Sequence, residues 1–439
     1  NKTETGDIVM EKKIPKVMAD LFDSLKEQWK DEPELLELFK NCYTNTLDTT
    51  VKRMEDGTTH VITGDIPAMW LRDSAAQLRP YIFLAKEDRE IREIIAGLVK
   101  RQFRYICIDP YANAFNASPS GACWEKDDPD QNPWVWERKF EVDSLCYPIQ
   151  MAWLLWKNTG CVSQFEGDFQ KGIGKILEVF RREQAHEENS DYRFIRGNSF
   201  YNDTLSREGK GALVKSNTGL IWSGFRPSDD ACTYGYLIPS NMFAVVVLGY
   251  LEEMEREIFH CPDLEKEARE LKEEIYNAIE SIGKTATEEF GVIYAYETDG
   301  YGMYNLMDDA NVPSLLAMDY LGYPGDPDTG ENTRRFLFSN ANPYYYEGKK
   351  AAGIGSPHTP SSYIWHISMA VQGLTSKEPE EKKRILRNMA ATTGGKGVMH
   401  EGFHVDDDTR YTREWFSWAN AMYAELFLDC SGYRLKIRA

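Results

Sequence analysis

The stretch Ser223–Phe243, SGFRPSDDACTYGYLIPSNMF, shows the kind of unit from which the whole chain is built. Asp229 and Asp230 stand side by side behind an Arg-Pro step, in a polar segment that belongs to a turn rather than to a helix face. Aromatic residues and a second proline follow, and a helix is expected from Pro239 onward. A polar turn pressed against an apolar run is typical of the mouth of a pocket.

The same alternation of helix and polar loop continues in both directions along the chain. Leu21, Leu25 and Trp29 recur at four-residue spacing and predict a helix that is interrupted at Pro33. The stretch Ala112–Glu137 lacks periodicity and predicts a long functional loop. Short strands are few. Periodicity predicts further helices at Glu90–Ile108, Val142–Trp156, Phe169–Glu187, Pro239–Phe259, Pro262–Ile279, Pro313–Leu321, Glu331–Phe338, Ser361–Leu374, Pro379–Ala391 and Arg413–Leu428.

The number of helices and the placing of polar residues predict the fold class. Roughly a dozen helices, with their chemistry held in loops, favour an all-α toroid of paired helices whose polar loops gather at one end. No linker of low complexity and no repeat of fixed length divides the 439 residues. We therefore expect a single domain over residues 1–439.

Composition narrows the class of partner. The net charge of −19 argues against nucleic acid and anionic lipid surfaces, and no apolar run is long enough to span a membrane. Eight cysteines without a CxxC pair argue against a thiolate zinc site and a disulfide scaffold. Aromatic residues make up 13% of the chain and could provide flat walls for sugar rings. The start at Asn1 without methionine is compatible with an exported or periplasmic protein, and a cytoplasmic protein is the alternative.

Two charged motifs precede the long apolar helices. In GDIPAMWLRDS, Trp70, Arg72 and Asp73 mark the point where a loop becomes a helix. The fork of Arg and the two acceptors of Asp suit paired sugar hydroxyls, whereas a helix cap with a surface ion pair is the alternative. In WVWERKFEVD the default interpretation is a solvated helix start, and a substrate role for Glu137 or Asp143 is the less favoured one.

The carboxylate pair Asp229-Asp230 and the segment around Glu401 carry the strongest chemical signals. Burying two adjacent carboxylates raises the pKa of one of them, as a general acid near neutral pH requires, although an Asx-type turn uses the same residues. Glu401 lies in His400-Glu401-Gly402-Phe403-His404, which formally matches the H-E-x-x-H motif of zinc peptidases. That motif needs a rigid helix, and glycines inside and before it oppose one. The alternative is a loop glutamate that activates water.

A loop histidine and a second pair of carboxylates complete the candidates. His358 lies between two prolines, where it could contact a substrate hydroxyl or cap a turn. Asp308 and Asp309 allow the same two interpretations.

Several of these motifs together resemble glycoside hydrolase family 125. They are GDIPAMWLRDS, SGFRPSDDACTYGYLIPSNMF, NVPSLLAMDYLGYP, SPHTPSSYIWHISM and HEGFHVDDDTRYTREWFSWANAMYAEL, and the likeness runs from about Met18 to Leu428. The resemblance implies an (α/α)6 barrel and an inverting exo-α-1,6-mannosidase that removes terminal mannose from mannans or N-glycan mannosides without a metal or other cofactor. It also implies a general acid in the RPSDD turn and a general base at Glu401.

The resemblance leaves the choice of the acid open. Related barrels carry a Gly-x-Asp-x-Ala/Ser pattern, and its second half at Asp229-Asp230-Ala231 favours Asp229, with Asp230 as the alternative. The residues expected to grip the terminal sugar are Trp70, Arg72, Asp73, His358, Arg413 and Glu414. Rival functions are a zinc metallopeptidase, another inverting (α/α)6 glycosidase, a sugar isomerase or epimerase, and a carbohydrate-binding protein without catalysis.

Overall fold

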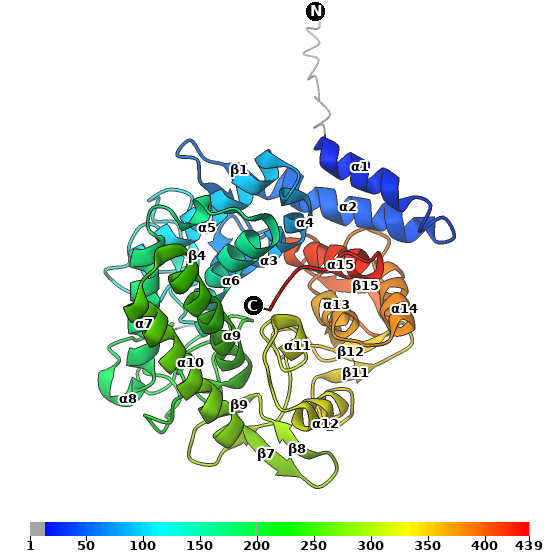
Figure 1. Cartoon of the computed structure of the whole chain (residues 1–439). Helices are drawn as coiled ribbons and strands as arrows, with labels where there is room; N and C mark the ends of the chain where they lie inside the picture. Colours follow the sequence, from blue (N-terminus) through cyan, green and yellow to red (C-terminus); the bar gives the residue numbers. More distant parts are fainter. Residues whose placement is uncertain (1–13, 198–199, 439) are drawn as a thin grey trace, which may run out of the picture.

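The computed structural model describes residues 14–197 and 200–438, which form a closed ring of paired helices (Figure 1). The inner helices of this part of the chain are α3 (Leu71–Leu78), α6 (Val142–Thr159), α9 (Ile238–Met254), α11 (Met318–Leu321), α13 (His366–Leu374) and α15 (Ser417–Cys430). The outer helices are α2 (Pro33–Thr49), α5 (Arg89–Ile108), α7 (Phe169–Glu183), α10 (Pro262–Ile282), α12 (Pro327–Leu337) and α14 (Pro379–Ala390). The predicted all-α barrel of paired helices is confirmed.

The distribution of apolar residues decides which helices are inner and which are outer. Helices α9 and α15 are apolar on nearly every side and are buried along almost their whole length. Helix α10 instead buries one stripe that includes Ala268, Leu271 and Ile275, and its other faces carry charged residues. A helix with a single apolar stripe packs against the core with that stripe, whereas an entirely apolar helix must lie inside.

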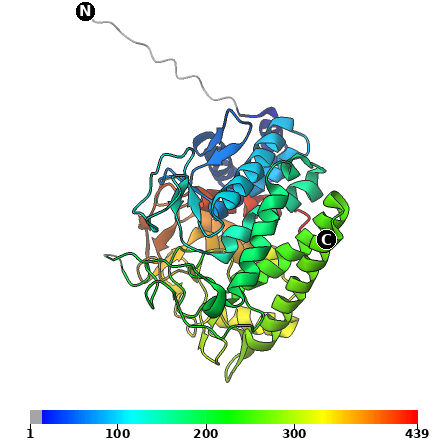
Figure 2. The ribbon, with the colours of Figure 1, turned by 90° about the vertical axis from the view of Figure 1, so that its left-hand side faces the viewer.

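Short strands and long loops lie at the end of the ring where the inner helices begin (Figure 2). Strand β3 (Met69–Trp70) leads directly into α3, β6 (Tyr236–Leu237) into α9, and β13 (Tyr363–Trp365) into α13. The remaining strands are β1 (Val51–Arg53), β2 (Thr59–Val61), β4 (Ala114–Phe115), β5 (Val135–Glu137), β7 (Lys284–Thr287), β8 (Gly291–Tyr294), β9 (Glu297–Thr298), β10 (Tyr304–Asn305), β11 (Tyr345–Glu347), β12 (Ala352–Ile354), β14 (Gly402–His404) and β15 (Asp407–Thr412). Because each inner helix starts at this end, the side chains of its first turn and of the preceding loop converge there.

Three predicted helices begin later than expected, because the residues predicted as their first turns form strands and loops at the end of the ring where the inner helices begin. Helix α13 starts at His366, since the preceding residues pair with β14 in antiparallel register. Helix α11 covers only Met318–Leu321, and α15 starts at Ser417 after the hairpin strand β15.

The N-terminal helices close the ring against the last one. Helix α1 (Lys16–Leu25) packs on α2, and α2 packs on α15. Trp29, in the connection between α1 and α2, stacks on Phe427 of α15 with ring centroids 4.5 Å apart. Its indole N–H donates to Ser431 at 2.9 Å. Two short helices, α4 (Ile82–Ala85) and α8 (His186–Asn189), complete the described α-helices. No helix within residues 14–197 and 200–438 has the length and apolarity needed to cross a membrane.

Candidate active site

A small pocket opens at the loop end of the ring. Its walls come from the loops before the inner helices and from the first turns of α3 and α15. The lining residues are Thr63, Ile66, Trp70, Arg72, Asp73, Pro227, Ser228, Asp229, Asn311, His358, Trp365, Glu401, Arg413, Phe416 and Trp418. Aromatic and charged side chains therefore share one small space, as a sugar-binding site requires.

Arg72, in the first turn of α3, is buried among four carboxyl groups. Its Nη1 lies 2.5 Å from Glu141 Oε2 and 3.1 Å from Asp143 Oδ2. Its Nη2 lies 3.0 Å from Asp229 Oδ1, and its Nε lies 3.4 Å from Asp73 Oδ1. Because a guanidinium presents its donors in one rigid plane, Arg72 fixes these acids relative to one another. The alternative of a helix cap with a surface ion pair is wrong, since all but Asp229 are buried.

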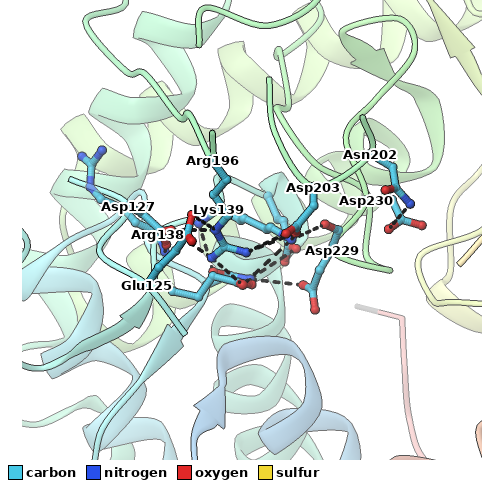
Figure 3. A network of polar contacts seen from close by, with 12 residues as sticks. Glu125, Asp127, Arg138, Lys139, Arg196, Asn202, Asp203, Asp229 and Asp230 are labelled. Atoms are coloured by element: carbon cyan, nitrogen blue, oxygen red, sulfur yellow. Dashed lines mark hydrogen bonds and ion pairs between the residues drawn. The ribbon is translucent and has the colours of Figure 1, made fainter. Parts of the chain in front are cut away.

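The charged run WVWERKFEVD is also buried, so the default expectation of a solvated helix start is wrong. Lys139 Nζ donates to the backbone carbonyl of Asp229 at 2.7 Å and to Asp203 Oδ1 at 2.5 Å (Figure 3). Arg196 in turn donates to Glu137 Oε2 at 3.0 Å and to Asp203. These paired charges support the Asp229 turn from behind, where an unpaired buried charge would be very costly.

Asp229 adopts a left-handed backbone conformation with φ of 68°. Its Oδ1 accepts hydrogen bonds from Trp70 Nε1 at 3.3 Å, Arg72 Nη2 at 3.0 Å and Asn113 Nδ2 at 3.1 Å. A quarter of the side chain remains exposed to the cavity. Unusual backbone conformations in non-glycine residues often occur where a functional side chain must be aimed. Here the turn directs the carboxyl group of Asp229 into the cavity.

Asp229 and the buried Glu141 lie side by side, since both accept hydrogen bonds from Arg72 and Asn113. Burial acts to raise the pKa of Asp229, but the charge of Arg72, the influence of Glu141 and the charge of Lys139 together lower it. Burial and the charge of Asp229 raise the pKa of Glu141 well above its ordinary value, against the charge of Arg72. Glu141 therefore holds a proton more readily than Asp229 does.

Asp230 follows Asp229 in the chain but faces other partners, and the two carboxyl groups are directed to different places (Figure 3). Its Oδ1 lies 3.0 Å from His358 Nδ1 and 3.3 Å from Asn202 Nδ2, and it does not line the cavity. Burial acts to lower the pKa of His358, yet the hydrogen bond and charge of Asp230 raise it to about 9. Asp230 thus holds a protonated His358 at the cavity wall.

Glu401 reaches the same cavity from the segment between α14 and α15. Its side chain is almost fully buried, and Oε2 lies 3.4 Å from Arg413 Nη1. Arg413 is itself held by Asp65, whose Oδ1 lies 2.6 Å from Nη2, and it stacks over Phe416 with 4.3 Å between the guanidinium carbon and the ring centroid. Arg413 therefore supplies a fixed positive charge beside the carboxylate of Glu401.

The H-E-x-x-H match does not form a zinc site. Residues Gly402–His404 form strand β14, which pairs with β13, so His400 and His404 do not share a helix face. The ring nitrogens of His400 lie 3.1 Å from the carbonyl oxygen of Glu414 and 2.8 Å from that of Thr393. Both nitrogens are thus engaged with the backbone, and the described residues include no group of three ligand-type side chains that could hold a metal ion.

Two other candidates lie outside the cavity. Glu414 is exposed, and its Oε2 accepts a hydrogen bond from the Tyr411 hydroxyl and lies 3.5 Å from Lys396 Nζ. Glu414 therefore does not belong to the site. Asp308 accepts hydrogen bonds from the backbone N–H groups of Leu315 and Leu316, which makes it a capping residue.

Sequence reasoning missed Glu141, Asn113 and Asp65, which hold the cavity residues in place. Asn113 Nδ2 is shared among Glu137, Glu141 and Asp229, and Asp65 fixes the guanidinium opposite Glu401. The one available signal was the alternation of charged and apolar residues in WVWERKFEVD, which is a strand-like pattern rather than a helical one.

A closed helical barrel with two carboxylates, Asp229 and Glu401, at one small pocket is the arrangement expected of a glycoside hydrolase. The chain belongs to the metal-independent alpha-mannosidases of glycoside hydrolase family 125, whose family model matches residues 32–428. It is 38% identical to the meiotically up-regulated gene 157 protein of Schizosaccharomyces pombe, across 94% of this chain and 85% of that protein.

Solved structures support the same assignment. A Streptococcus pneumoniae metal-independent alpha-mannosidase, in a non-productive complex with alpha-1,6-mannobiose, is 51% identical, with 95% of this chain and 99% of that chain covered and a TM-score of 0.93. A bacterial glucoamylase complexed with acarbose is 13% identical, with a TM-score of 0.55 over 91% of this chain and 56% of that chain. The second likeness shows the barrel fold alone. The zinc peptidase alternative is not favoured.

Proposed function

We propose that this protein is an inverting exo-α-1,6-mannosidase that removes terminal mannose from mannans or N-glycan-derived mannosides. The observation that carries the proposal is that Asp229 and Glu401 line one cavity from different sides of the ring. Asp229 precedes α9 and Glu401 precedes α15, and these helices stand three places apart among six inner helices. Family membership supports the mannoside, and the α-1,6-mannobiose bound by the pneumococcal relative supports the linkage.

The roles of the two acids follow from inverting chemistry. Asp229 donates a proton to the glycosidic oxygen as the C1–O bond breaks, and the bonding electron pair leaves with that oxygen. Glu401 accepts a proton from the water that attacks C1 from the opposite face, and the product is mannose of inverted configuration. Inverting enzymes separate their carboxyl groups by roughly 6.5–9.5 Å to leave room for that water. Approach from different sides of the ring supports such a separation.

The other cavity residues grip the terminal sugar in this proposal. Trp70 and Trp418 provide aromatic surface, while Asp73 and the protonated His358 offer an acceptor and a donor for hydroxyl groups. Burial raises the pKa of Asp73 to about 6, so its protonation changes near neutral pH. A small pocket, rather than an extended groove, favours removal of one residue at a chain end over cleavage inside a polymer.

One NMR experiment tests linkage and stereochemistry together. The enzyme is mixed with α-1,6-mannobiose, and the anomeric proton signals are followed before mutarotation. We expect β-mannose to appear first, with little turnover of the α-1,2- and α-1,3-linked disaccharides. Initial release of α-mannose would overturn the inverting mechanism, and preference for another linkage would overturn the substrate. A chelator should leave the rate of mannobiose cleavage unchanged, whereas an enzyme that depends on zinc would lose its activity.

A further inference from the structure

Four carboxyl groups meet around a single guanidinium at the floor of the cavity. Arg72 contacts Glu141, Asp143, Asp229 and Asp73 within 2.5–3.4 Å. Three of these acids are buried, and the side chain of Asp229 is a quarter exposed. Carboxylates that repel at this range in a buried site cannot all be ionised when one cation serves them. The cluster therefore retains protons at neutral pH.

The position of one retained proton follows from the hydrogen bonds. Arg72 bridges Glu141 and Asp229 through its two terminal nitrogens, and the amide of Asn113 bridges the same two acids from another side. Glu141 and Asp229 therefore lie side by side on the same two donors. A proton on one of these carboxyl groups can be donated to the other, because an ionised carboxylate only accepts.

Charged groups from every neighbouring element surround this pair. They are Arg72 and Asp73 on α3, Glu137 on β5, Lys139 before α6, Asp143 on α6, and Glu401, Arg413 and His358 around the cavity. Arg72 and Lys139 pull Asp229 toward its ionised form, which opposes the role of a proton donor. A neighbouring group must therefore keep a proton available to Asp229.

We propose that Glu141 is a positioning residue that shares one proton with Asp229 and keeps this acid protonated during catalysis. This inference rests on the function proposed above. When the proton sits on Asp229, Glu141 is the anion that pairs with Arg72, and its negative charge opposes ionisation of Asp229. Asp229 then gives that proton to the glycosidic oxygen. The pair recovers a proton from solvent water, while Glu401 releases to solvent the proton it took from the attacking water.

The test is the pH dependence of Glu141→Gln. Glutamine has nearly the same volume but no charge, and its NH2 group donates to Asp229 and stabilises the ionised carboxylate. The activity of the wild type falls as pH rises through the pKa of the acid. We expect the alkaline limb of kcat/KM for α-1,6-mannobiose to move down by about one pH unit or more in the variant, with about a tenfold loss or more of kcat at pH 7.

A second substrate separates proton supply from structural damage. A 2,4-dinitrophenyl α-mannoside has a leaving group that needs no protonation, so Glu141→Gln should retain most of the wild-type kcat on it. Equal losses on both substrates, with an unmoved alkaline limb, would overturn the proposal. Wild-type enzyme that fails to cleave α-1,6-mannobiose would instead overturn the proposed function, and the comparison on the activated mannoside would still test Glu141.

Two control variants test whether the shift of the alkaline limb depends on the charge of Glu141. Glu425→Gln removes another buried Glu–Arg pair, in which Glu425 Oε1 lies 2.9 Å from Arg79 Nε. Neither residue lines the cavity, so this variant should leave the limb unmoved. Glu141→Asp retains the charge and should restore the limb toward the wild-type position. A limb as far displaced in Glu141→Asp as in Glu141→Gln would contradict the shared proton.

A measurement on the wild type does not depend on the folding of any variant. Carbon NMR of the side-chain carboxyl groups should show Asp229 and Glu141 titrating together, each in two steps, as coupled acids do. Independent single-step titrations would overturn the proposal. The Gln variant is nonetheless expected to fold, because it removes one of the four acids that crowd Arg72.

Discussion

Asp229 and Asp230 are neighbours in the chain, yet the turn between Arg226 and Ala231 gives them different surroundings. Phe225 and Ala231 form an antiparallel bridge, and the positive φ of Asp229 turns its side chain into the cavity. Asp230 is directed toward His358 instead. Side chains that follow each other in a tight turn point apart, so a one-residue difference decides which acid faces the cavity.

The two aspartates should therefore differ in their mutant kinetics. We expect Asp229→Asn to lower kcat for α-1,6-mannobiose by about 10²–10⁴-fold, the usual contribution of a general acid. Asp230→Asn should mainly raise KM, because it loosens and partly neutralises His358. Steady-state kinetics of both variants provide the measurement. The reverse order of effects would assign the acid to Asp230.

Glu401→Gln tests the other half of the mechanism. Glutamine cannot accept the proton of the attacking water, so kcat should fall by about 10²–10⁴-fold while the unfolding temperature stays close to that of the wild type. A 2,4-dinitrophenyl α-mannoside should rescue Asp229→Asn but not Glu401→Gln, since a better leaving group does not activate water. Turnover of Glu401→Gln near the wild-type rate would remove Glu401 from the mechanism.

Much of the residue-level site could be predicted from sequence motifs. Trp70, Arg72, Asp73, Asp229, His358, Glu401 and Arg413 all line the cavity. Glu414 was predicted for its place beside Arg413, but β15 ends before it and its carboxylate turns to solvent. Glu141 could not be predicted, because its meaning depends on Arg72 and Asp229, which are remote in sequence.

At the scale of elements, the start of α13 connects the barrel to the segment that carries Glu401. His366 is the first residue of α13 and is fully buried. Its Nδ1 accepts a hydrogen bond from the backbone N–H of His400 at 2.9 Å, and its Nε2 lies 3.1 Å from Thr392 Oγ1. Burial, followed by the charge of His400, lowers the pKa of His366 to about 3. The ring therefore stays neutral in the folded protein at pH 5.

This lowered pKa predicts a loss of stability in acid. The unfolded chain binds a proton at a histidine below about pH 6.5, whereas folded His366 does so only near pH 3. The free energy contributed by His366 is therefore present above pH 6.5 and is lost as pH falls toward 3, with a slope of up to ~1.4 kcal/mol per pH unit. His366→Gln should remove that slope.

Urea unfolding at pH 7.5 and pH 5 measures the effect. The difference in free energy of unfolding between the two pH values should be smaller in His366→Gln than in the wild type. His260→Asn is the control, because His260 is exposed and its left-handed backbone conformation tolerates asparagine. An equal pH dependence in wild type and His366→Gln would contradict the assignment.

At the scale of the whole molecule, the first described helices meet α15 where the ring closes. Trp29 is buried between α1 and α2 and stacks on Phe427 of α15, and Arg387 of α14 pairs with Glu32. Contacts between neighbouring inner helices run from α13 through α15, α3, α6 and α9 to α11, and nearly all of the buried apolar residues form one cluster. The single domain predicted from the sequence remains a prediction, which ring closure supports.

A substitution that weakens the closure of the ring should lower the stability of the whole molecule in one cooperative step. Trp29→Ala removes a large buried ring and should lower the free energy of unfolding by about 3–5 kcal/mol. We expect one cooperative transition in both proteins, with coincident curves from circular dichroism and tryptophan fluorescence. Separate transitions for the two probes in the wild type would indicate more than one domain.

The sequence by itself determined the helical barrel, the loop end and the motifs of an α-mannosidase, because helix periodicity, turn residues and local motifs are properties of short segments. Only the tertiary structure decided which aspartate faces the cavity and which buried acid lies beside it. Those questions depend on distances between residues remote in the chain and on the charges that burial brings together. The pKa of an acid in a buried cluster depends on all the charged groups of that cluster, so it cannot be derived from one segment of the sequence.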